Sequence, residues 1–231
     1  MKKVLINLDR STERLETFYR VNKHIEGVER FSAIEGKGLR QPLKQSGLLL
    51  EYGNVDYTDG ALGCALSHAE QWRLAISSGG GRTVIEDDAV FCKNFEEEHK
   101  RLLKTLPETW DIILWGYNCR KPIVYEQRSD LYCATEFDQT LLQEKVHLWT
   151  ERHVTGNLFK VIRVLGLFCY SISPKGAKKF LEFCFPLRAV SGVWSEGIDI
   201  PMAALYPEME AYICTPPLVV HDGDISQIFY S

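Results

Sequence analysis

The sequence lacks any continuous apolar run of about 18 residues, so it contains no segment expected to cross a membrane as a helix. Its first eight residues, MKKVLINL, begin with two lysines, but the apolar part is short and Asp9 and Arg10 follow it directly. This stretch is therefore interpreted as a first β-strand and not as a signal peptide.

Cysteine pairs and excess positive charge are also missing. The seven cysteines are scattered, odd in number and never spaced C-x-x-C, which argues against a zinc site or a disulfide framework and predicts a reducing, cytoplasmic location. The net charge of −4 excludes the broad basic field typical of proteins that bind nucleic acids. Internal repeats, low-complexity segments and linkers are absent, so we expect residues 1–231 to form one domain.

The known glycine-rich phosphate-binding motifs are missing as well. Neither G-x-x-x-x-G-K-[ST] nor G-x-G-x-x-G occurs. The run GGGR at 79–82 precedes an expected strand instead of following one, so it is interpreted as a turn.

What is present is an alternation of apolar strands with amphipathic helices. Strands are predicted at 3–8, 29–34, 83–86, 110–116, 164–173 and 211–215, and helices near 11–25, 60–77, 94–105, 174–184 and 199–206. This order predicts an α/β fold with a mostly parallel central sheet covered on both faces. The stretch 117–160 is polar, aromatic and irregular, with a weak helix near 139–149, and is interpreted as an insertion over the sheet's binding edge.

Three consecutive carboxylates, Glu86, Asp87 and Asp88, follow the apolar run at 83–85. Ligands of open α/β sheets bind at the carboxyl ends of strands, and oxygen ligands suit Mg²⁺ or Mn²⁺ bound to phosphate. The triplet therefore predicts a metal and phosphate site, and a solvated acidic turn is the alternative.

The end of the first strand carries a second polar group. Asn7, Asp9, Arg10 and Arg14 lie just past it, where arginines and backbone amides can hold a nucleotide base and its diphosphate. The alternative is a helix capped by Ser11 with surface arginines.

Polar residues also stand in two later segments. Ser67 and His68 interrupt an apolar helix, which means either satisfied buried hydrogen bonds or a face that lines a site. Near the end of the chain, Glu196 and Asp199 are candidate bases and His221 is a candidate late metal ligand. A helix N-cap at Asp199 and a structural histidine are the alternatives.

Five motifs in order resemble glycosyltransferase family 25, the lipooligosaccharide galactosyltransferases, whose relatives include the collagen galactosyltransferases. They are INLDRSTERLE, GALGCALSHAEQW, VIEDDAVF, WDIILWG and CYSISPKGAKKFLE, spanning roughly residues 3–185. The resemblance implies a GT-A-type, Rossmann-like single domain, a UDP-sugar donor (usually UDP-galactose), a divalent metal (Mn²⁺ or Mg²⁺) and inverting transfer. It also implies a glycan or glycolipid acceptor of lipopolysaccharide type, with peripheral contact at the inner face of the inner membrane.

The resemblance also assigns roles to residues. It implies Asp88 as the direct metal ligand, with Glu86 and Asp87 in ribose, sugar or metal-supporting contacts. The opening motif would line the nucleotide pocket through Asn7, Leu8, Asp9, Arg10 and Arg14, and Ser67 would form part of its wall. Family members often have Gln near the position of His221. Its role as a metal ligand is therefore implied by the wider GT-A fold, whose members use a late histidine on the metal, and not by the family itself.

Asp199 is the first candidate for the base that deprotonates the acceptor hydroxyl, and Glu196 is the second. Two rival functions share these features: another metal-phosphate enzyme such as a nucleotidyltransferase, and a nucleotide-sugar-binding relative without turnover.

Overall fold

The computed structural model describes residues 1–51, 57–119, 121–138, 142, 145–189 and 197–221. The strands are β1 (Lys2–Asn7), β2 (Val28–Ser32), β3 (Leu49–Glu51), β4 (Arg82–Glu86), β5 (Ala89–Phe91), β6 (Ile112–Gly116), β7 (Ile123–Arg128), β8 (Leu131–Thr135), β9 (Asn157–Arg163), β10 (Cys169–Ile172), β11 (Leu187–Ala189), β12 (Ala211–Thr215) and β13 (Val219–His221). The helices are α1 (Thr12–Val21), α2 (Arg40–Gln45), α3 (Asp59–Ser78), α4 (Phe95–Leu103), α6 (Pro174–Cys184) and α7 (Asp199–Leu205), with 3₁₀ turns η1 (Val146–Glu151) and η2 (Tyr206–Glu208).

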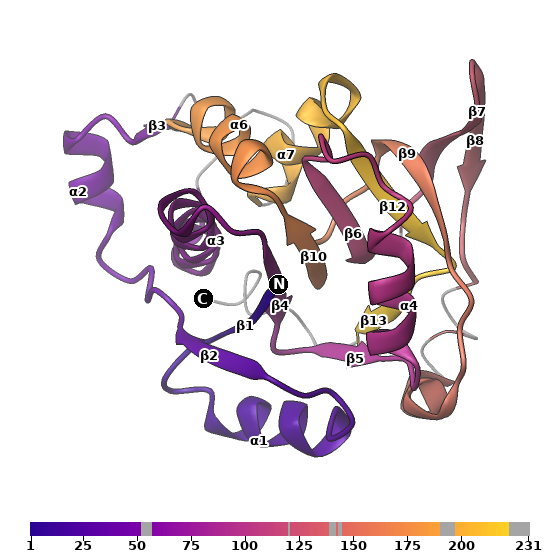
Figure 1. Ribbon diagram of the computed structural model, residues 1–231. Coiled ribbons are helices and arrows are strands. Elements are labelled where there is room, and N and C mark those ends of the chain that lie inside the picture. Colours follow the sequence, from indigo (N-terminus) through magenta and orange to yellow (C-terminus); the bar gives the residue numbers. More distant parts are fainter. Residues whose placement is uncertain (52–56, 120, 139–141, 143–144, 190–196, 222–231) are drawn as a thin grey trace.

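One nine-stranded sheet, in the order β2-β1-β4-β10-β6-β12-β9-β7-β8, joins strands from both ends of the chain (Figure 1). The pairings make β1, β2, β4, β6, β7 and β12 run in one direction and β8, β9 and β10 in the other. The predicted α/β class with a Rossmann-like central sheet is confirmed. Six of the nine strands run in one direction, but three pairings are parallel and five are antiparallel, so the sheet is mixed. The antiparallel strand β10 between β4 and β6 was not predicted, because apolar periodicity does not encode strand direction.

Both faces of the sheet are buried, as the apolar strands predict. Along β6, Ile112 and Leu114 belong to one hydrophobic cluster, whereas Ile113 and Trp115 belong to the other. The first cluster contains residues of α3, α6 and α7, and the second contains residues of α1 and α4. These helices therefore cover opposite faces of the sheet (Figure 1).

The longest helix, α3, has a clear start and end. The Thr58 side chain caps it by accepting from the Ala61 amide, and Gly79 ends it in the left-handed conformation at φ 67°. Helix α6 starts as predicted, with Pro174 in its first turn and Ser173 as the cap. Ser11 is the N-cap residue of α1, but its side chain makes no capping hydrogen bond, so the predicted cap is only positional. Among the described residues, no helix combines the length and hydropathy needed to cross a bilayer.

The stretch 117–160 is more regular than the sequence suggests. It contains the β7–β8 hairpin and most of β9, which extend the main sheet, and the described part of the predicted weak helix includes a 3₁₀ turn, η1. The hairpin was missed because most of its side chains are exposed or half-buried, so the apolar alternation that marks a strand is weak.

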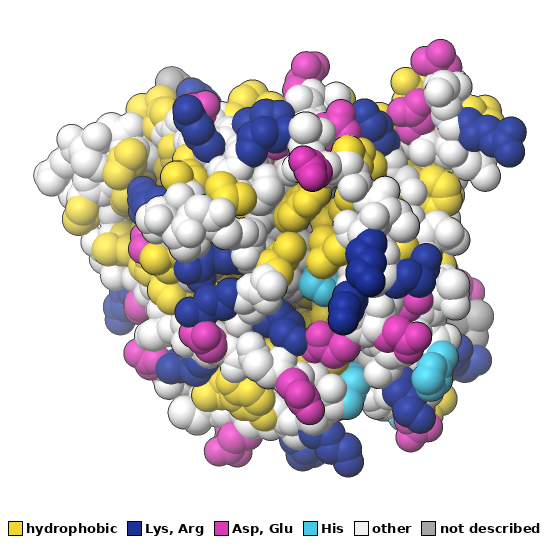
Figure 2. Space-filling model, in the orientation of Figure 1, with side chains coloured by type: hydrophobic (Ala, Val, Ile, Leu, Met, Phe, Trp, Pro, Cys, Tyr) yellow, Lys and Arg dark blue, Asp and Glu magenta, His cyan; other side chains and the backbone are white. Residues whose placement is uncertain are grey.

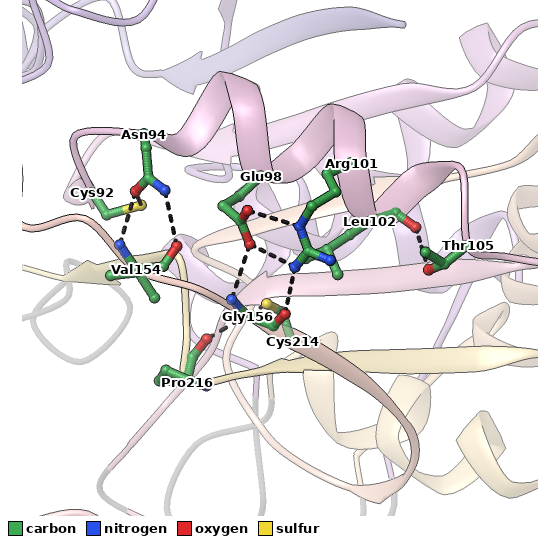
Figure 3. A network of polar contacts seen from close by, with 10 residues as sticks. All are labelled: Cys92, Asn94, Glu98, Arg101, Leu102, Thr105, Val154, Gly156, Cys214 and Pro216. Carbon is green, nitrogen blue, oxygen red and sulfur yellow. Dashed lines mark hydrogen bonds and ion pairs between the residues drawn. The ribbon is translucent and has the colours of Figure 1, made fainter.

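A polar network fixes the end of this stretch to α4 (Figure 3). The Glu98 carboxylate accepts from the Gly156 amide at 3.0 Å and from Arg101 at 2.8 and 2.7 Å, while Asn94 bonds both the amide and the carbonyl of Val154. Arg101 also donates to the Gly156 carbonyl at 2.7 Å, and its guanidinium holds the pKa of Glu98 below the usual value. These hydrogen bonds therefore hold the backbone of the segment before β9 against α4.

The loop after β2 lies against the first turns of α3 with no room for side chains. A Cβ on Gly36 would overlap the carbonyl oxygen of Asp59, and one on Gly63 would overlap the carbonyl oxygen of Ile34. Both glycines permit this close backbone approach, which holds the loop at residues 33–36 against the start of α3.

We expect Gly36→Ala to lower the free energy of unfolding by about 1–3 kcal/mol, since backbone atoms must move to admit the methyl group. Urea denaturation monitored by circular dichroism would measure this change. Gly80→Ala is the matched control, because its nearest neighbour would be the Ser78 side-chain oxygen at 3.9 Å. Equal stability of the two variants would show that the loop is not packed as described.

Candidate functional site

The main pocket lies where the carboxyl ends of β1 and β4 meet the N-terminal half of α3. The two strands are paired, with Ile6 opposite Glu86, so the polar residues that follow them converge. The pocket encloses about 110 Å³. Eight of the predicted site residues line it: Asn7, Leu8, Arg10, Arg14, Ser67, Glu86, Asp87 and Asp88.

Asp87 is held from two elements at once. Arg14, from α1, donates through Nε and Nη2 to Asp87 Oδ1 at 2.9 and 2.5 Å. Asn7, at the end of β1, donates through Nδ2 to Asp87 Oδ2 at 2.7 Å. Both carboxylate oxygens therefore have charged or amide donors, so Asp87 connects β1, α1 and the turn after β4.

Asp88 lies deeper than its neighbour, with 7% of its surface exposed. Its Oδ2 is 3.6 Å from Arg14 Nη2, so one guanidinium serves both aspartates. His221 is also buried, in β13, and pairs in register with Ala89, the residue after Asp88. Its ring stacks near Phe168, with centroids 4.5 Å apart. The pairing of β13 with β5 thus places the backbone of His221, the predicted late histidine, beside the residue that follows the acidic turn.

The charges around the pocket do not balance. Its lining holds two arginines, Arg10 and Arg14, against four carboxylates, which gives 2 − 4 = −2; the acids are Glu35, Glu86, Asp87 and Asp88. Arg10 pairs with Glu35 at 3.2 Å and Arg14 with Asp87, so each arginine already has an acidic partner. The surface in Figure 2 also mixes basic and acidic side chains. A binding site of this charge favours cations.

Glu86 is the end of a buried hydrogen-bond chain. His68 Nε2 lies 3.2 Å from Glu86 Oε1, His68 Nδ1 lies 2.9 Å from the Tyr170 hydroxyl, and Trp72 Nε1 lies 3.0 Å from the same hydroxyl. An indole nitrogen only donates, so Tyr170 accepts from Trp72; a carboxylate only accepts, so His68 uses Nε2 as the donor to Glu86, and in neutral His68 the Nδ1 atom accepts from the Tyr170 hydroxyl. His68 then carries its proton on Nε2 and donates it to Glu86, which orients this carboxylate on the pocket wall.

Two sets of side chains could hold a metal here. The ligand atoms of Cys64, His68 and Glu86 all lie within 4.8 Å of one another, and these are the one such group of three among the described residues. Burial, and then the charge of Glu86, raise the pKa of the Cys64 thiol, which keeps it protonated. Oxygen ligands suit Mg²⁺ and Mn²⁺ better than a thiol, so the acidic turn fits these ions better.

Asp199 and Asp9 lie outside the pocket lining. Asp199 Oδ2 accepts from the Gly166 amide at 2.8 Å, and Asp199 is the first residue of α7, whose N-cap residue is Ile198, so the alternative of an N-cap at Asp199 is wrong. Burial, and next the charge of Glu86, raise the pKa of Asp199. The Asp9 side chain turns toward Arg30 and Ser32 and is 74% exposed. It therefore points away from the pocket that it was predicted to line.

Glu196, the second candidate base, lies outside the described residues. Ser67 lines the pocket, and it is fully buried: its hydroxyl donates to the Gly63 carbonyl at 2.7 Å and accepts from the Ile34 amide at 2.8 Å. Ser67 therefore also fixes the wall to the 33–36 loop.

Sequence reasoning missed the part of the pocket built from small residues and a loop. Ala33, Ile34, Glu35, Gly36, Gly60, Gly63 and Cys64 line it as well. Two glycines at 60 and 63, early in an otherwise strong helix, were the available signal, because glycine inside a helix often marks a close approach of another backbone.

Known proteins resemble this chain in sequence. The profile of the family described as "Glycosyltransferase family 25 (LPS biosynthesis protein)" matches residues 1–192. "Putative glycosyltransferase R655" of Acanthamoeba polyphaga mimivirus is 29% identical over 186 residues, which cover 79% of this chain and 52% of that protein.

Two animal relatives match over shorter segments. Human "Procollagen galactosyltransferase 2" is 30% identical over 127 residues, covering 48% of this chain and 20% of that protein. Mouse "Inactive glycosyltransferase 25 family member 3" is 34% identical over 95 residues, covering 36% of this chain and 16% of that protein. The chain therefore spans about half of the viral relative and less of the animal ones.

Arg14→Gln is expected to lower the free energy of unfolding by about 1.5–3 kcal/mol, because it removes a charged hydrogen-bond donor from two buried or half-buried aspartates. Arg10→Gln is the matched control from the same pocket. Arg10 and Glu35 are each about half exposed, so its loss should cost less than about 1 kcal/mol. Urea titrations of both variants would compare them, and an equal loss would contradict the structural role of Arg14.

Proposed function

Because the chain belongs to glycosyltransferase family 25, we propose that it transfers a hexose from a UDP-sugar to a hydroxyl of a glycan acceptor. The observation that carries the proposal is the pocket at the ends of β1 and β4, where four carboxylates outnumber two arginines that are both already paired. Galactose is the first choice of sugar, and it is supported by the name of the human relative.

The charge balance supports a divalent metal, Mn²⁺ or Mg²⁺. A donor diphosphate is itself anionic and would be repelled by a lining with an excess of carboxylates, so it would need to arrive with a cation. Asp88 would be the direct ligand, with Asp87 and His221 beside it. Such ions are usually held by one or two carboxylates and by substrate phosphates. When bound, the metal would neutralise the charge that develops on the leaving diphosphate.

The chain's own residues would orient the donor and remove a proton. Arg14 and Asn7 fix Asp87 in place, and the His68–Tyr170–Trp72 chain fixes Glu86, so both carboxylates present oriented oxygens to sugar or ribose hydroxyls. Asp199 would act as the base on the acceptor hydroxyl, and burial, which raises its pKa, makes it a better proton acceptor. One displacement at the anomeric carbon would invert its configuration.

The acceptor is proposed to be a glycan of a growing glycolipid such as lipopolysaccharide. The β7–β8 hairpin extends beyond the body of the molecule at one edge of the sheet (Figure 1), and it exposes Leu131 and Tyr132 by 53% and 56%. Exposed apolar side chains at such a tip would support peripheral contact with a membrane surface.

Two other functions use the same features. A nucleotidyltransferase would also bind a nucleotide and a metal at an acidic strand end. A relative without turnover would keep the pocket, and the mouse relative is named inactive. Mass spectrometry of products from UDP-sugars and from nucleoside triphosphates separates these cases. Sugar transfer supports the proposal, whereas pyrophosphate release without sugar transfer would overturn it.

Asp88→Ala is expected to abolish the stabilisation of the protein by UDP and Mn²⁺. Saturating UDP at about 100 times its Kd should stabilise the wild-type chain by about 2.7 kcal/mol, which raises Tm by several degrees. Asp9→Asn is the matched control, since Asp9 turns away from the pocket, and it should keep the shift. Loss of the shift in both variants, or in neither, would contradict the assignment of Asp88.

Asp199→Asn should keep UDP affinity but reduce transfer by a factor of about 100 or more, because the base would be lost without loss of the donor pocket. Glu86→Gln is measured in parallel, because Glu86 is a second carboxylate that a buried histidine orients at the pocket wall. Transfer rates from UDP release, together with UDP affinities from calorimetry, would separate the two. Full activity of the Asp199 variant would reassign the base.

A further inference from the structure

A second cleft lies at the amino ends of β1 and β4, whereas the main pocket lies at their carboxyl ends. It encloses about 760 Å³ and is lined by residues at the start of β1 and β4, by the turn after α3 and by the start of α6. Arg82 begins β4 and Glu86 ends it, which separates the two sites by about 13 Å along the strand. Nothing in the proposed transfer reaction uses this cleft.

Arg82 is the unusual residue in this cleft. It is 8% exposed, and its Nε has no hydrogen-bond partner. Within the described ranges, its side chain forms no ion pair or hydrogen bond at all. A buried guanidinium without a counter-charge is costly, and arginines at such depth are almost always paired. Among the described residues no acid pairs with Arg82, although Glu108 lines the same cleft.

The surroundings of Arg82 favour an anion. Lys2 lies opposite Arg82 in the β1–β4 register and lines the same cleft, but its ammonium already pairs with Glu29 at 2.6 Å, so in the described part of the chain Arg82 is the cation there without a partner. Helix α6, of 11 residues, begins at Pro174 on the cleft wall, so its positive N-terminal end adds to the field. Glu108 also lines the cleft, but it is exposed and screened by solvent, whereas the charge of buried Arg82 is screened far less.

We propose that this cleft binds the phosphate group of a soluble molecule, with Arg82 as the principal ligand. A guanidinium pairs with phosphate oxygens through parallel N–H donors, and the two Nη groups of Arg82, which unlike Nε are not among the buried unpaired atoms, would make this contact from the cleft wall. The cleft is larger than a phosphate ion, and Trp110 and Pro174 give it an apolar wall, so the phosphate would be carried on a larger body. This site is independent of the donor pocket and of the proposed transfer.

Titration of the full chain with inorganic phosphate tests the proposal, with EDTA present so that no metal holds phosphate in the donor pocket. Chloride of equal ionic strength is the blank. We expect saturable stabilisation in the wild-type chain and about tenfold or weaker affinity in Arg82→Gln, since one charged bidentate contact is lost. Arg10→Gln, in the donor pocket, should keep the wild-type affinity. Equal phosphate affinity in wild type and Arg82→Gln would overturn the proposal.

Two further measurements keep the test decisive. Arg82→Gln should fold at least as stably as wild type in phosphate-free buffer, because it removes an unpaired buried charge. If the variant does not fold, amide chemical shifts of the wild-type chain locate the phosphate: shifts at residues 80–82 and 175–176 support the site, and shifts confined to residues 7–10 and 86–88 overturn it. Arg82-dependent binding to phosphatidic acid vesicles without any effect of inorganic phosphate would overturn the soluble ligand.

Discussion

The pairing of Asp87 with Arg14 and Asn7 is the interaction on which the main site depends. Three consecutive carboxylates at the end of a buried strand repel one another, and the fold compensates by bringing an arginine from α1 and an amide from the end of β1 to the middle one. This leaves Glu86 and Asp88 on either side, each with a different environment. Glu86 meets a buried histidine, and Asp88 lies beside the shared guanidinium and the strand that carries His221.

The elements with strong apolar periodicity could be predicted from the sequence. Strands β1, β4, β6 and β12 and helices α3 and α6 lie close to their expected bounds, because each buries a continuous face. The β7–β8 hairpin was missed because its exposed or half-buried side chains give a weak apolar alternation, and the short strands β3, β5 and β11 were missed because each pairs with a strand far away in the sequence. The direction of β10 was likewise invisible, because apolar residues alternate identically in parallel and antiparallel strands.

The candidate site, like the fold, could be predicted from the sequence only in part. Residues at or just past a strand end, such as Asn7 and Asp88, could be assigned to one site because parallel strands bring their ends together. Residues that reach the site from a loop could not, and Glu35 and Gly36 are examples. Asp9 shows the opposite failure: its position in the chain is correct, but its side chain turns outward to Arg30, which no sequence pattern indicates.

The position of β10 has a consequence for how the chain reaches this structure. Residues 169–172 lie between β4 and β6, so the strands at 82–86 and 112–116 have no mutual edge to pair with until β10 is available. The centre of the sheet therefore forms only after more than 170 residues have been synthesised, and its formation involves contacts of long sequence separation, which slow folding. Until then β4 lacks a partner on one side and β6 lacks both of its neighbours, and such unpaired strand edges favour aggregation of the growing chain.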